Sequence, residues 1–126
     1  MRNEKEKLLV LKENVIADKS KQFALRIIKM YEYLIAEKIE IVLARQLLRS
    51  GTSIGANVKE GLRGQSKADF YAKMNIALKE ASETEYWLEL FYESGMISLQ
   101  HFQSIYSDCQ ELLRLLMAIT KTQKRD

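Results

Sequence analysis

The sequence predicts an all-α protein that folds as an antiparallel, left-handed four-helix bundle. The 126-residue chain has no proline and 5 glycines, and this scarcity of helix-breaking residues is typical of long helices joined by short turns. Hydrophobic residues make up 47% of the chain and charged residues 29%, which indicates one globular domain with its own core. Apolar residues recur at alternating spacings of three and four along four segments, and such seams favour this bundle.

The first predicted helix covers residues 18–37, with Asp18 as its N-cap because a carboxylate accepts hydrogen bonds from free backbone N–H groups. Residues 1–13 are an N-terminal arm with three alternatives: a short helix, a frayed arm, or an arm that docks on a neighbouring subunit. The apolar run from Leu8 to Leu11 argues against a fully solvated arm. The seam of the first helix is Ser20, Phe23, Ile27, Met30 or Tyr31, and Leu34.

The join to the second helix is poorly marked, because residues 37–42 contain no Gly, Pro or Asn. A β-branched cluster and a slip in the periodicity indicate a turn, and one continuous helix is the alternative. The second helix is predicted over residues 41–62. Gly61 and Gly64 offer left-handed positions at its C-terminal end.

Serines mark the starts of the last two helices. Ser66, followed by Asp69, predicts a third helix that runs to about Glu93. Gly95 predicts its end, and Ser98 caps the fourth helix. The third seam is Phe70, Met74, Ala77, Ala81, Thr84, Leu88 and Phe91, and the fourth is Phe102, Ile105, Cys109, Leu112, Leu116 and Ile119. The fourth helix is predicted to end in the cations Lys121, Lys124 and Arg125, which suit a helix C-terminus.

The second helix is unusual because its poor helix formers sort into three stripes when they are wound at 100° per residue. The apolar stripe is Leu47, Gly51, Ile54, Val58 and Leu62. The polar stripe is Gln46, Ser50, Ser53, Asn57 and Glu60. The basic stripe is Arg45, Arg49, Thr52, Ala56, Lys59 and Arg63.

Each stripe predicts a contact. Gly51 and Gly55 each cost about 1 kcal/mol of helix propensity, so we expect them to allow another helix to approach closely. The polar stripe is either solvent-exposed or a hydrogen-bonding ladder that fixes register between helices or subunits, and we favour the ladder. The basic stripe is either a solvated face or a contact for nucleic-acid phosphates without base specificity.

The net charge of +3 is unevenly distributed. Residues 1–63 hold 13 Lys and Arg against 8 Asp and Glu, and residues 64–126 hold 7 against 9. This asymmetry allows a basic face in the first half of the chain. If several subunits pooled their basic stripes in a ring, their fields would add.

No catalytic, metal or cofactor site is expected from the motifs. The glycine-containing run lacks the P-loop pattern, and His101, predicted to be exposed in a first helical turn, has no acid at the spacing of a di-iron site. Cys109 is interpreted as a small apolar residue. The carboxylates Glu80, Glu83, Glu85 and Glu89 are interpreted as a solvated face, with Glu83 beside Lys79. Core-edge or subunit-interface positions are expected for Tyr86, Trp87 and Tyr92.

No apolar run approaches the roughly 18 residues that span a bilayer, and the first apolar run is too short for a signal peptide. We therefore expect a cytoplasmic protein without a membrane partner, and the single cysteine agrees with this compartment.

Two long segments, residues 46–61 and 76–88, resemble the signature of the 23S ribosomal RNA intervening-sequence protein family. The resemblance extends through Ser66 to Phe70 and upstream to residues 19–24, and covers roughly residues 14–122. It divides the chain into the arm at 1–13, a bundle domain at 14–122 and a basic tail at 123–126.

The resemblance implies an up-down-up-down bundle with a turn near Lys38, assembled into a ring-shaped homopentamer. It implies a bacterial protein from a family without an established enzymatic activity. A related branch is the strongly basic accessory protein of diversity-generating retroelements, which partners a reverse transcriptase. The modest charge of this chain argues against that role.

Our first hypothesis is therefore a non-enzymatic homo-oligomeric bundle that binds RNA or DNA. The alternative is a scaffold for a protein partner such as a reverse transcriptase, contacted through the polar stripe and the aromatic residues. An enzyme is not expected, because no nucleophile, base and orienting group come together. The nucleic-acid-binding residues of the first hypothesis are Arg45, Arg49, Lys59 and Arg63, with Arg26 and Lys29 from the first helix.

Overall fold

The structure, a computed structural model, describes residues 2–123. It contains four helices: α1 (Glu4–Ala36), α2 (Ile41–Leu62), α3 (Lys67–Glu93) and α4 (Leu99–Thr120). No strand occurs between residues 2 and 123. The predicted all-α class, the predicted bounds of the second and third helices and the predicted start of the fourth are confirmed. The fourth helix ends at Thr120, before the cations that were expected at its end. Lys124 and Arg125, expected at the end of the fourth helix, lie outside the described residues, as does most of the predicted tail at 123–126.

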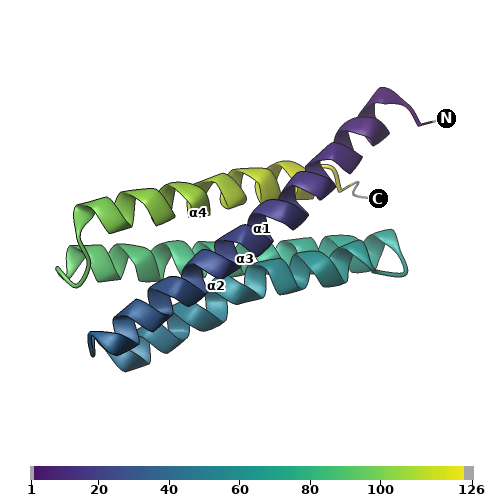
Figure 1. Cartoon of the computed structure of the whole chain (residues 1–126). Helices are drawn as coiled ribbons and strands as arrows, with labels where there is room; N and C mark the ends of the chain where they lie inside the picture. The colour runs from purple at the N-terminus through teal and green to yellow at the C-terminus, as the bar shows by residue number, and fades with distance from the viewer. Residues whose placement is uncertain (1, 124–126) are drawn as a thin grey trace.

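The helices form a four-membered bundle in which each helix contacts two others. The contacting pairs are α1 with α2, α2 with α3, α3 with α4, and α4 with α1. Figure 1 shows that the chain reverses its direction at each of the three turns. The left-handed twist stays a prediction.

The first helix begins much earlier than expected. Asn3 is its N-cap, and the Asn3 side chain accepts a hydrogen bond from the Glu6 backbone N–H at 2.8 Å. The prediction of Asp18 as the N-cap is therefore wrong: Asp18 lies exposed in the middle of α1. The arm is helical from residue 4 and continues without a break into the bundle. In Figure 1 this end of α1 extends past the ends of the other helices.

The turn between α1 and α2 uses residues that seldom adopt left-handed backbone. Lys38 has φ 56° and Glu40 has φ 27°, and the Ile39 N–H donates to the Leu34 carbonyl at 2.8 Å. The predicted turn near Lys38 is confirmed, and the alternative of one continuous helix is wrong.

The other predicted helix caps are present, but the two glycines at the turn between α2 and α3 do not have the predicted left-handed backbone. The Ser66 and Ser98 side chains accept hydrogen bonds from the Asp69 and His101 N–H groups at 3.1 and 3.2 Å. Gly95 has φ 80°, as its predicted place after a helix requires. The left-handed prediction for Gly61 and Gly64 is wrong, because neither has a positive φ.

Close packing explains why small residues stand at the second turn. A Cβ atom on Gly61 would lie 3.0 Å from the Lys73 Cβ, and one on Gly64 would lie 3.0 Å from the Asp69 Cβ. These two glycines therefore allow the start of α3 to approach the end of α2.

The four seams meet in one hydrophobic core. Most seam residues are buried, and Phe70 and Phe102 at the ends of their seams are half-buried, as are Met30 and Tyr31. Ile16 and Leu113 extend the core beyond the predicted seams. Among the described residues, no helix is both long and apolar enough to cross a membrane.

Candidate nucleic-acid interface on α2

The apolar stripe of α2 faces the core and α1. Leu47, Ile54 and Val58 are buried, whereas Leu62 at the end of the helix is exposed. A Cβ atom on Gly51 would lie 2.8 Å from Ile27 Cγ1, and one on Gly55 would lie 3.3 Å from the Ser20 carbonyl oxygen. The prediction that these glycines let another helix approach closely is confirmed.

The polar stripe faces α3, and one of its residues makes a hydrogen bond to the neighbouring helix. The Ser50 and Thr84 hydroxyl oxygens lie 2.8 Å apart, and both residues are buried. Ser53 and Asn57 instead donate to carbonyls of α2 itself. Gln46 and Glu60 are exposed, and Glu60 pairs with Lys73 at 3.5 Å. Within the chain the stripe therefore fixes register at Ser50, and its role between subunits stays a prediction.

The basic stripe is interrupted at Arg49. The Arg49 guanidinium forms ion pairs with Glu83 and, at 3.2 Å, with Glu80. These hydrogen bonds raise the pKa of Arg49 above its ordinary value. Because two carboxylates of α3 neutralise it, Arg49 adds little positive potential to the surface. The expected contact between Glu83 and Lys79 is replaced by this pair.

Three cations of the basic stripe project freely into solvent. Arg45, Lys59 and Arg63 are exposed, and none has an ion-pair partner within residues 2–123. At about 1.5 Å of rise per residue, the row from Arg45 to Arg63 is about 27 Å long. Its middle, at Thr52 and Ala56, carries small side chains. The result is an elongated surface with basic ends.

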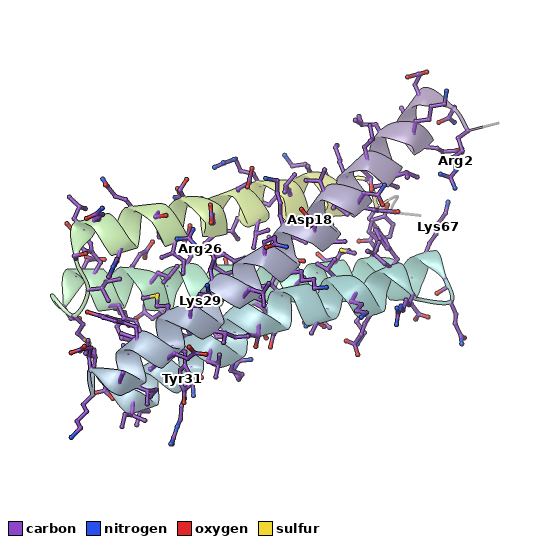
Figure 2. The ribbon with its side chains drawn as sticks, viewed as in Figure 1. Arg2, Asp18, Arg26, Lys29, Tyr31 and Lys67 are labelled. Atoms are coloured by element: carbon purple, nitrogen blue, oxygen red, sulfur yellow. The ribbon has the colours of Figure 1, made fainter. Side chains whose placement is uncertain are left out.

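The two candidate cations of α1 lie elsewhere. The Arg26 guanidinium pairs with Asp108 and donates to the Ser104 hydroxyl of α4 at 2.9 Å. Lys29 is exposed and has no ion pair among the described residues. Both residues border α4, on the side of α1 away from α2, and Figure 2 labels them. The structure therefore does not join them to the α2 row.

The four carboxylates of α3 do not form the expected solvated face. All four are half-buried. Glu80 and Glu83 hold Arg49, whereas Glu89 accepts a hydrogen bond from the Tyr106 hydroxyl at 2.5 Å. Burial and the nearby Glu89 charge raise the pKa of Glu85. In residues 2–123 no group of three or more His, Cys, Asp or Glu side chains is placed to hold a metal ion.

The remaining singled-out residues lie largely where expected. His101 is exposed in the first turn of α4, and Cys109 is buried in the core. Tyr92 stacks on Phe102 with ring centroids 4.5 Å apart, and Trp87 is half-buried, as core-edge residues are. Tyr86, however, is 53% exposed.

Fold and surface together define a small helical bundle with a row of free cations on its second helix. The chain belongs to the 23S rRNA-intervening sequence protein family, whose model matches residues 12–118. A crystal structure at 1.70 Å of a protein with unknown function from the S23 ribosomal protein family of Bacteroides thetaiotaomicron VPI-5482 is similar. It shares 52% sequence identity and a TM-score of 0.85, over 88% of this chain and 99% of that chain. No curated protein matches the sequence.

Proposed function

We propose that this protein is a non-enzymatic, homo-oligomeric bundle that binds RNA or DNA through the cations of α2. The observation that carries the proposal is the exposed row of Arg45, Lys59 and Arg63, which have no acidic partner in residues 2–123. The family's name, which refers to an intervening sequence of 23S rRNA, supports an RNA ligand.

The row suits a nucleic-acid backbone in length and charge. Each strand of a duplex carries one phosphate about every 3.4 Å along the helix axis, so a row of about 27 Å spans the axial length of roughly eight base pairs. Contacts of this kind position a protein on the backbone without reading bases. In a pentameric ring, five such rows would add their fields and strengthen binding.

The expected salt dependence follows from counterion release. Three phosphate contacts on a duplex predict that log K falls against log salt with a slope of about −2.7 for each bound row. Raising the salt from about 50 to about 200 mM then weakens binding about 40-fold for one row, and more where several rows are bound.

The test combines light scattering with titration of a structured RNA at both salt concentrations. We expect an oligomer near five times the 14.7 kDa chain, whose mass rises when RNA is added. Arg45→Glu combined with Lys59→Glu should abolish the rise. The matched control is Lys79→Glu with Arg114→Glu, which changes the charge equally at exposed positions on α3 and α4. RNA binding that survives the α2 substitutions, or that both pairs weaken equally, refutes the proposal.

An oligomer whose mass does not change with RNA at either salt concentration would instead favour the alternative function, a scaffold for a protein partner. Tyr86 and Trp87 support that alternative. Tyr86 is 53% exposed, its ring lies 5.3 Å from that of Trp87, and within the described part of the chain the buried Trp87 Nε1 has no acceptor. Aromatic side chains of this kind are enriched at protein interfaces.

A further inference from the structure

A groove of about 570 Å³ lies between α1 and α4, beside the turn that joins α3 to α4. In Figure 1 the later half of α1 diverges from the beginning of α4. The groove is separate from the α2 row, and neither the family's name nor the similar structure assigns it a role.

Two cations and no carboxylate line this groove, and Asp108 outside the lining balances the charge of one of them, Arg26. Arg26 and Lys29 line it from α1, and every other lining residue is neutral or a histidine. Asp108 and Ser104 hold the Arg26 guanidinium in place through its two terminal nitrogens. The ion pair with Asp108 balances the Arg26 charge, but since a guanidinium has five N–H donors, Arg26 can still donate hydrogen bonds to a ligand. Lys29, one turn further along α1, supplies a cation free of any ion pair among residues 2–123.

An aromatic pair and an apolar floor stand beside these cations. The Tyr33 and His101 rings meet edge to face, with centroids 5.6 Å apart and an interplanar angle of 82°. Tyr33 is 43% exposed, so part of its ring is open to a ligand. Ile97 and Ile105 are buried residues that line the same groove. Lys29 and Tyr33 are four residues apart and therefore neighbours on one face of α1.

We propose that this groove binds a nucleotide unit, with its phosphate at Arg26 and Lys29 and its base against Tyr33 and His101. A phosphate joined to a flat ring matches a cationic wall beside an aromatic one, because bases stack on aromatic side chains and phosphates bind Lys and Arg. The base has to be unpaired to enter. Where the nucleotide belongs to a strand, the proposal rests on the proposed function and adds a preference for unpaired over duplex nucleic acid.

Calorimetric titration tests the groove with adenosine 5′-monophosphate, inorganic phosphate, a single-stranded oligoadenylate of ten nucleotides and a duplex of equal length. We expect the monophosphate to bind more tightly than phosphate. Lys29→Gln and Tyr33→Leu should each weaken the monophosphate and the oligoadenylate at least fivefold. The matched controls are Lys21→Gln, exposed on α1 outside the groove, and Tyr86→Leu, exposed on α3. Both should stay within twofold of the wild type.

The results separate the two proposals and the two sources of the ligand. The proposal for the groove is overturned if the monophosphate binds no more tightly than inorganic phosphate. It is also overturned if the Tyr33→Leu and Tyr86→Leu proteins bind the monophosphate with equal affinity. The duplex would then still report on the α2 row through Arg45→Glu with Lys59→Glu. If the groove substitutions weaken both ligands, equal affinities for monophosphate and oligoadenylate identify a free nucleotide as the ligand. An oligoadenylate that stays tighter than the monophosphate when Arg45→Glu and Lys59→Glu remove the α2 row identifies a strand.

Discussion

Replacing Gly51 with alanine is expected to destabilise the bundle, although alanine is the better helix former. The added Cβ atom would lie 2.8 Å from Ile27 Cγ1 and 2.9 Å from Ile27 Cγ2. Ile27 is fully buried, so its branched side chain has no space to withdraw. Overpacking of this kind costs about 1–3 kcal/mol, and alanine returns about 1 kcal/mol of helix propensity. The net change is therefore a loss of about 0–2 kcal/mol, and because two carbon atoms are approached below 3 Å, we expect a value in the upper half of this range.

Urea unfolding followed by circular dichroism measures this free energy. Ala56→Gly calibrates the propensity term, because Ala56 is an exposed position of the same helix, and it should cost about 1 kcal/mol. In an Ile27→Ala background, which removes both obstructing carbons, Gly51→Ala should instead stabilise the protein. If Gly51→Ala stabilises the wild type by the amount that Ala56→Gly costs, then α1 and α2 do not approach as closely as described.

Three further predictions concern buried or strained positions. Thr84→Val removes one partner of the buried hydroxyl pair with Ser50 and should cost about 1–2 kcal/mol in urea unfolding, whereas adding Ser50→Ala should cost little more; additive losses would contradict the pairing. Burial raises the pKa of the Cys109 thiol from 9.0 to about 12. The stability that the neutral thiol contributes is therefore complete below about pH 9 and is lost as the pH rises toward 12. Between about pH 8 and 10.5 the free energy of unfolding of the wild type should fall by about 2 kcal/mol relative to that of Cys109→Ala. Unfolding free energies that change in parallel with pH in the two proteins would disprove the pKa shift. Lys38→Gly should raise the melting temperature and add about 1 kcal/mol, because Lys38 has φ 56°; an unchanged melting temperature would show that the turn is unstrained.

Helix starts and seams were predictable where local chemistry determines them. Ser66 and Ser98 cap helices whose seams repeat at threes and fours, so three of the four helices were placed correctly. The start of α1 was missed, although Asn3 followed by Glu6 is a capping pattern. The left-handed position in the turn between α1 and α2 is occupied by Lys38 and not by glycine or asparagine, so residue type gave no indication of this backbone conformation.

The candidate site was less predictable, because it depends on how neighbouring helices are rotated about their axes. The sequence places Arg49 and Lys59 on one stripe, but only the packing of α3 shows that Arg49 is neutralised by Glu80 and Glu83. The groove likewise needs α4 to bring His101 to Tyr33, which is distant in sequence. The one available signal in the sequence is the four-residue spacing of Lys29 and Tyr33, which puts both on one face of a helix.

The order of contacts around the bundle also has a kinetic consequence. Three of the four contacting pairs are consecutive in the chain, and the fourth joins α1 to α4, partly through the Lys19–Glu111 and Arg26–Asp108 ion pairs. Contacts between consecutive helices require closure of short loops only, which is typical of proteins that fold within microseconds to milliseconds. We therefore expect the α1–α4 contact to form after the folding transition state, so that weakening it speeds unfolding and leaves the folding rate nearly unchanged.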